Sequence, residues 1–109
     1  MSLLTDVVVV TSGGEDAAIV AVNAAMAAHA TPGCPAEFEL RPVGSKDDFG
    51  GSKVASAHVY GGCFNFLPWA EFCDAIRAAP WRIPGHVLAW IDGENDEDGP
   101  TVLRPGRQV

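Results

Sequence analysis

The sequence has few basic residues, with 7 Lys and Arg against 14 Asp and Glu and a formal net charge of −7. Binding to the phosphate backbone of a nucleic acid needs a basic face, and anionic membrane surfaces also attract basic segments. The composition therefore argues against nucleic acid and membrane as partners. An acidic surface is suited to solubility or to a basic protein partner.

Long apolar runs are also missing. The longest, residues 17–28, contains Asn23 and falls short of the ~20 residues that span a bilayer. No basic segment precedes the first apolar stretch, and Asp6 interrupts it, so no signal peptide is expected. The sequence contains three cysteines, Cys34, Cys63 and Cys73. Because an odd number cannot be used in full by an intramolecular disulfide framework, we expect free thiols in the cytoplasm.

Spacings typical of metal and phosphate sites are absent as well. The sequence has no C-x-x-C, H-x-x-H or H-E-x-x-H pair. Gly13 and Gly14 lack the further glycines or the lysine of a phosphate-binding loop, and Glu15 and Asp16 would repel a phosphate there. We therefore expect no metal and no cofactor.

Apolar residues are plentiful enough for one packed core, since 48% of the chain is hydrophobic and only 19% is charged. A β-branched run at 6–11 predicts a strand, and its lack of alternation is typical of a strand covered on both faces, or at least of a central strand. Residues 13–29 predict a helix, with Ser12 as N-cap and Glu15 reaching back to it in a capping box.

The middle of the chain predicts two more strands. Apolar and charged residues alternate over 37–41, and Pro42 places that strand at a sheet edge because proline has no N–H donor. Residues 54–60 predict the next strand, with Val59 toward the core. The side chains expected on the opposite face are His58 and Tyr60.

The last third predicts a second helix over 68–79, opened by Pro68 and stopped by Pro80. A strand over 86–91 and a short returning strand at 101–103 follow. The side chains expected in the core are Val8, Val10 (or their alternate neighbours), Ile19, Val22, Met26, Phe38, Leu40, Val59, Trp69, Phe72, Cys73 and Ile76.

The order β-α-β-β-α-β is that of the split βαβ, ferredoxin-like folds. We therefore predict one α+β domain over residues 1–109, a two-layer sandwich that ends in a short irregular C-terminal tail. Its antiparallel sheet has four strands, with two helices on one face and the strands at 6–11 and 54–60 in the centre. The open face would carry His58, Tyr60 and Trp90.

The open face is the first candidate interface. Leu88 and Trp90 would form an apolar patch on it, and such patches usually have a partner. We expect a homodimer, or the segment around Val102 and Leu103 folded back over the face. Phe49, in a Gly-rich loop, would either cover this face or anchor a partner.

The acidic turn at 92–99 is the second candidate. Its carboxylates are Asp92, Glu94, Asp96, Glu97 and Asp98. Three of them are spaced as in the first half of an EF-hand loop, but Pro105 stands where that loop needs a glutamate. The turn is either a solvated connection or a surface that faces a basic protein partner.

The absence of a catalytic constellation favours a small acidic interaction protein, an accessory or inhibitory factor. The alternative is a small enzyme or ligand-binding domain that uses His58, Tyr60 and His86 on the open sheet face. A pair of Cys63 with His58 is not favoured, because five residues along a strand put two side chains on opposite faces.

The stretch from Val59 to Ile91 resembles small uncharacterised proteins encoded by actinobacteria and their phages. The resemblance rests on Val59-Tyr60, Phe64-Asn65-Phe66, a short helix, Ala79-Pro80-Trp81, and an aliphatic strand followed by an acidic segment. It implies no activity and no site residue.

Overall fold

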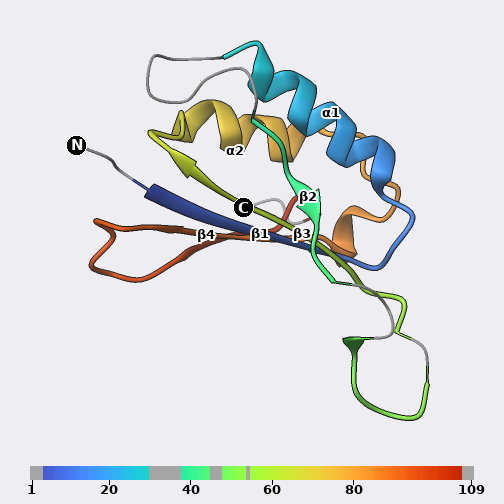
Figure 1. The fold of residues 1–109 in the computed structure, drawn as a ribbon. Coiled ribbons are helices and arrows are strands. Elements are labelled where there is room, and N and C mark those ends of the chain that lie inside the picture. Colours follow the sequence, from blue (N-terminus) through green and yellow to red (C-terminus); the bar gives the residue numbers. More distant parts are fainter. Residues whose placement is uncertain (1–3, 30–37, 45–47, 54, 107–109) are drawn as a thin grey trace.

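Two helices lie on the same side of a five-stranded antiparallel sheet in the computed structural model, which describes residues 4–29, 38–44, 48–53 and 55–106 (Figure 1). The strands are β1 (Leu4–Thr11), β2 (Arg41–Pro42), β3 (His58–Asn65), β4 (Leu88–Gly93) and β5 (Thr101–Leu103). The helices are α1 (Asp16–Ala27) and α2 (Trp69–Ala78), and a 3-10 turn, η2 (Pro84–His86), precedes β4. The expectations for Cys34, Glu37 and Val54 concern residues outside the described ranges.

The sheet has five strands rather than the four that we expected, in the order β2-β3-β1-β4-β5. The fifth arises because residues 101–103 pair with the edge of β4, with Trp90 opposite Val102. The same pairing corrects the expectation that this segment folds back over the open face, since β5 widens the sheet instead. Pro42 lies on an edge strand and β1 is central, as predicted.

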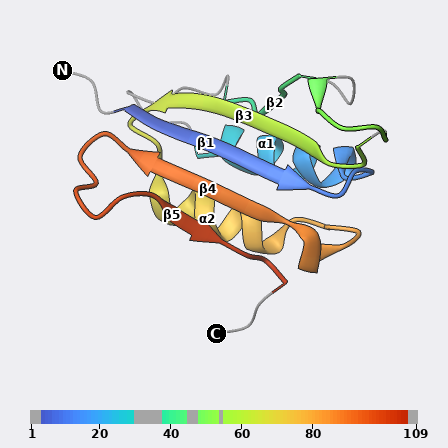
Figure 2. The same cartoon turned by 90° about the horizontal axis from the view of Figure 1, so that it is seen from below.

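The central strand β1 alternates between two environments. Val7 and Val9 face the helices and are buried, whereas Val8 and Val10 lie on the other face and are only half-buried. In the part of the chain that the structure describes, no helix covers that second face (Figure 2). Of the two interpretations of this apolar run, the central strand is confirmed, whereas cover by helices on both faces is not found among the described residues, because both helices pack on one side.

Helix α1 begins at Asp16 rather than at residue 13, and the expected capping box does not form. Gly13 and Gly14 have φ values of 96° and 71°, a left-handed turn that glycine adopts without strain. The N–H of Gly13 donates to Oγ1 of Thr11 at 3.1 Å, inside this turn. The Glu15 side chain does not cap the helix but faces a distant segment, described below.

The side chain of Asn23 on α1 takes the place of a strand partner for residues 38–40. Its Oδ1 accepts the N–H of Leu40 at 2.9 Å, and its Nδ2 donates to the Leu40 carbonyl at 3.3 Å. Phe38 and Leu40 are buried as predicted, although only Arg41–Pro42 form a strand. The strand expected over 37–41 is shorter, since the N–H and carbonyl of Leu40 bond to the Asn23 side chain instead of to a neighbouring strand.

Most of the predicted core is confirmed. The buried members are Ile19, Val22, Met26, Phe38, Leu40, Phe72, Cys73 and Ile76. Phe38 stacks on Phe64 with ring centroids 4.0 Å apart and lies 5.9 Å from the ring of Phe72. Among the described residues, no helix combines the length and the apolar character needed to cross a membrane.

Candidate functional site

The open face of the sheet is the face away from the helices (Figure 2). Apolar side chains from three neighbouring strands, β1, β4 and β5, form a block on this face. The register places Val8 beside Trp90, and Trp90 beside Val102. Val10 and Leu88 form the next pair along β1 and β4. Val102 is 45% exposed and the other four side chains are half-buried, so water reaches the whole block. Leu88 and Trp90 thus lie where the sequence placed them.

Charge divides the open face along the strands. Asp6 and Asp92 are paired in register near the start of β1, and Cys63 lies opposite Asp6 on β3. At the far end, Leu103, the last residue of β5, pairs with Ala89, and the exposed Arg104 follows directly. The face is therefore acidic at one end and apolar in the middle, and a cation lies just past the other end of β5.

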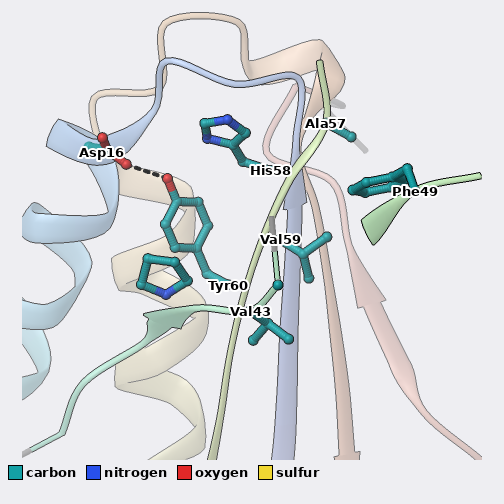
Figure 3. A pocket seen from close by; sticks show the side chains of 9 residues that line it. Asp16, Val43, Phe49, Ala57, His58, Val59 and Tyr60 are labelled. Atoms are coloured by element: carbon teal, nitrogen blue, oxygen red, sulfur yellow. Dashed lines mark hydrogen bonds between the residues drawn. The ribbon is translucent and has the colours of Figure 1, made fainter. Parts of the chain in front are cut away.

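Tyr60 does not lie on this face, contrary to the sequence expectation. It is 2% exposed, beneath α1, and its hydroxyl donates a hydrogen bond to Oδ1 of Asp16 (Figure 3). Because side chains alternate along a strand, His58 shares this side and Val59 lies on the open face. Tyr60 thus takes the core position that we expected for Val59, and its hydroxyl still reaches a polar partner at the start of α1.

Burial of the ring is the main reason why the pKa of Tyr60 rises from 10.0 to about 12. The hydrogen bond to Asp16 and the negative charges of Asp16 and Glu15 raise this pKa further. At neutral pH the phenol is therefore protonated and acts as a donor to Asp16. It cannot serve as a general base under those conditions.

A cavity of about 330 Å3 lies beside β3 where β2 ends (Figure 3). Asp16, His58 and Tyr60 supply its polar groups. Its apolar walls come from Pro42, Val43, Phe49, Ala57 and Val59. The described lining therefore combines one carboxylate, one imidazole and one phenol with apolar walls, a composition suited to binding a small ligand.

The cavity brings together only part of the predicted polar set. His58 and Tyr60 line it, and Phe49 joins them from the loop that follows β2. His86 is exposed in η2 and Trp90 is on the open face, and neither lines the cavity. The expected grouping of His58, Tyr60 and His86 on one sheet face is therefore wrong, because the first two lie on the helix side of β3.

Cys63 is an exposed free thiol on the open face. A hydrogen bond to Asp6, then burial and the charges of Asp6 and Glu94, raise the pKa of the Cys63 thiol. A raised pKa leaves less of the reactive thiolate at neutral pH. His58 and Cys63 lie near opposite ends of β3 and on opposite faces, so they form no nucleophile–base pair.

The acidic turn is the tip of the hairpin between β4 and β5, and two of its carboxylates hold it in place. Oε1 of Glu94 accepts the N–H of Leu4 at 2.9 Å, and the N–H of Glu94 donates to the Leu4 carbonyl at 2.9 Å. Oδ2 of Asp96 accepts the N–H of Gly93 at 3.1 Å. Glu97 and Asp98 are exposed at the tip. No group of three or more His, Cys, Asp or Glu side chains within the described ranges could hold a metal ion.

Trp69 lies beside this hairpin rather than in the predicted core, and is 39% exposed. It shares a surface depression with Glu97, Asp98 and Thr101. As the first residue of α2 it lies at the end of the helix, whereas Phe72 and Ile76 are one and two turns further in and are fully buried. Phe72 and Ile76 are thus buried as predicted, whereas Trp69 lies next to the hairpin.

Sequence reasoning missed the role of Glu15, which is 2% exposed. Its Oε1 accepts the N–H of Arg82 at 2.7 Å and its Oε2 accepts the N–H of Ile83 at 3.0 Å. Nη2 of Arg82 donates in return to the Gly13 carbonyl at 3.3 Å. The partners are 67 and 68 residues apart in the chain, so no local pattern could have indicated them. These bonds fix the turn before α1 to the segment after α2.

The candidate residues thus occupy three places. Trp90 lies on the open face. Phe49, His58 and Tyr60 line the cavity. The carboxylates of the acidic turn lie in the hairpin between β4 and β5. Comparison with models of protein families, with curated proteins and with solved structures finds no match.

Proposed function

We propose that the protein is a non-enzymatic interaction protein, an accessory or inhibitory factor that docks a partner on its open sheet face. The observation that carries this proposal is that β1 bears valine on both faces while the helices cover only one. Val7 and Val9 are buried, whereas Val8 and Val10 are partly in contact with water. Apolar residues on both faces are typical of strands in sheets covered on both sides. Removing Val8, Val10 and Trp90 from water contributes a favourable term of about 25 cal/mol for each Å2 of apolar surface buried, which the loss of translational and rotational freedom partly offsets.

A photo-crosslinking amino acid at Val102 tests this proposal in the cell that makes the protein. Val102 is 45% exposed on the open face, and Val20, 66% exposed on α1, is a matched control on the helix side. We expect covalent adducts from position 102 and few from position 20. Absence of adducts from position 102 would contradict docking on this face, and the mass of any adduct identifies what docks.

A second candidate function is small-ligand binding, which the cavity beside β3 favours. Its volume of about 330 Å3 is within the range of small-molecule pockets. Among the described residues that line it, Asp16 supplies the single carboxylate, and the apolar walls include Phe49. An apolar amine fits this combination, since its cation would pair with Asp16. We expect such amines to raise the melting temperature, and Asp16→Asn to abolish the shift. No shift with any amine would contradict this function.

We further propose that the fold is a ferredoxin-like sandwich with one added strand, and that the protein resides in the cytoplasm. The chain order β1-α1-β2-β3-α2-β4 and the central position of β1 support the first statement. The free thiols of Cys63 and Cys73 are consistent with a reducing compartment and support the second. Refolding yields with and without reductant would test the compartment, since we expect oxidation to lower the yield.

A further inference from the structure

We infer that the partner on the open face is a second copy of this chain, related by a two-fold axis that lies in the interface and crosses the strands. This inference rests on the proposed function and names its partner. It predicts a face-to-face pair of sheets whose facing β1 strands run in opposite directions.

The apolar block of one chain can contact the same block of a second chain, because the block includes β1, the central strand of the sheet. Val8 and Val10 are on β1, and Leu88 and Trp90 are beside them on β4. In a contact between identical surfaces, residues near the two-fold axis face their own counterparts. Valine and tryptophan side chains make favourable contacts with copies of themselves, whereas charged residues at this place would repel.

Charge selects the direction of the axis. Asp6 and Asp92 lie at one end of the face, and the acidic hairpin with Glu94 extends that end. An axis along the strands would put these carboxylates against the partner's own acidic end, where like charges cost free energy. An axis across the strands separates the two acidic ends. It also brings Arg104, which follows β5, toward the partner's acidic end.

The loop that carries Phe49 is placed to extend this contact. Figure 1 shows residues 48–53 hanging on the open-face side of the sheet, beyond the end where β3 begins. Phe49 and, at the opposite end of the sheet, Leu4 are both large exposed apolar side chains. With the axis across the strands, the loop of one copy lies over the end of the partner that carries the partner's Leu4. The loop therefore adds apolar area at both ends of the pair.

The area of the face indicates how stable the pair is. A strand residue covers about 16 Å2 of sheet, from a rise of about 3.3 Å and a strand spacing of about 4.8 Å. The five strands therefore present about 430 Å2 each in projection, or roughly 900 Å2 for two copies, at the low end of specific interfaces. We thus expect a reversible dimer that dissociates in the micromolar range.

Sedimentation velocity of the purified full chain over a range of concentrations tests the inference. We expect a rapid equilibrium between the 11.4 kDa monomer and a species of twice that mass. Arg104→Glu is expected to raise the dissociation constant several-fold at low salt. Arg77→Glu, on the exposed side of α2, is the matched control because it makes the same change in net charge away from the face. Circular dichroism checks that both variants are folded.

The outcomes separate the inference from the function on which it rests. A monomer at every concentration overturns the second copy as partner, and the proposed function then survives only if position 102 cross-links to a different protein. A dimer that Arg104→Glu and Arg77→Glu weaken equally overturns the axis across the strands. Loss of the Arg104 effect at high salt, with the Arg77 variant unchanged, supports it.

Discussion

The carboxylate of Glu15 joins two parts of the chain that are distant in sequence. Its substitution should therefore lower the free energy of unfolding by more than most substitutions of a polar side chain. In Glu15→Gln, one oxygen that accepts the N–H of Arg82 or Ile83 becomes an amide group that can only donate. A partly buried N–H is then left facing a donor, which costs about 1 kcal/mol or more. Urea denaturation of the variant measures this loss of stability.

Glu97→Gln is the matched control for that measurement. Glu97 is exposed at the tip of the hairpin, and such surface changes alter stability by about 0.5 kcal/mol or less. Equal stabilities for the two variants would show that the buried contacts of Glu15 do not stabilise the turn.

Tyr60 predicts a loss of stability in alkaline solution. Its pKa is raised from 10.0 to about 12 in the folded chain, so the folded state holds this proton more firmly than the unfolded state does. The contribution of Tyr60 to stability is complete below pH 10 and is lost as the pH rises through about 12. Because the chain has a single tyrosine, the ultraviolet absorbance of tyrosinate reports this group alone. A titration midpoint near 10 in the folded protein would contradict the buried hydrogen bond to Asp16.

Among the elements, α2 is held to the sheet by Phe72, which is fully buried against Phe38. We expect Phe72→Ala to lower the free energy of unfolding by about 3–5 kcal/mol, because it removes a large side chain and leaves a cavity. Trp69→Ala, on the same helix but 39% exposed, should cost less than half as much. Denaturant unfolding of both variants provides the comparison, and similar losses would contradict the assigned packing of α2.

The hairpin between β4 and β5 makes a prediction about a basic partner. Glu97→Gln with Asp98→Asn leaves the hydrogen bonds of Glu94 and Asp96 in place, so the fold should be unchanged. If the hairpin attracts basic partners, this double variant should associate more slowly with an octalysine peptide at low salt, because steering depends on exposed charge. Stopped-flow measurement gives the rate.

A double variant on α2, Glu71→Gln with Asp74→Asn, removes the same charge elsewhere. If both double variants reduce the rate of association with the peptide equally, the hairpin is only a solvated turn. In that case net charge alone determines the rate.

The sequence predicted those elements that depend on a periodic pattern of apolar residues or on contacts between residues close together in the chain. The extent of α2, the edge position of Pro42 and the outward Trp90 all follow from such patterns. The start of α1 could not be predicted, because it depends on the bond from Arg82 to the Gly13 carbonyl in the turn before the helix. The burial of Tyr60 could not be predicted either, because its hydroxyl donates to Asp16 on α1. Both contacts join segments more than forty residues apart. Of the candidate residues, Trp90 lies on the open face as expected, whereas Phe49, His58 and Tyr60 line a cavity that no local pattern indicated.

For the whole molecule, self-association links stability to concentration. If the dimer is more resistant to unfolding than the monomer, the melting temperature must rise with protein concentration, since mass action favours the associated state. We expect this rise for the unchanged chain and a smaller one for Arg104→Glu. Differential scanning calorimetry over a wide concentration range measures it. A melting temperature independent of concentration would contradict association in the folded state.

The two outer strands of the sheet limit how far such an assembly can grow. β2 has two residues, one of them a proline without an N–H, and β5 has three. Long free strand edges recruit further chains side by side and lead to filaments, whereas edges this short offer few hydrogen-bonding groups to a newcomer. If two copies pair face to face as proposed, the apolar block of each copy is covered by the other. Such a two-fold contact is closed, so we expect the proposed dimer to remain dispersed even at high concentration.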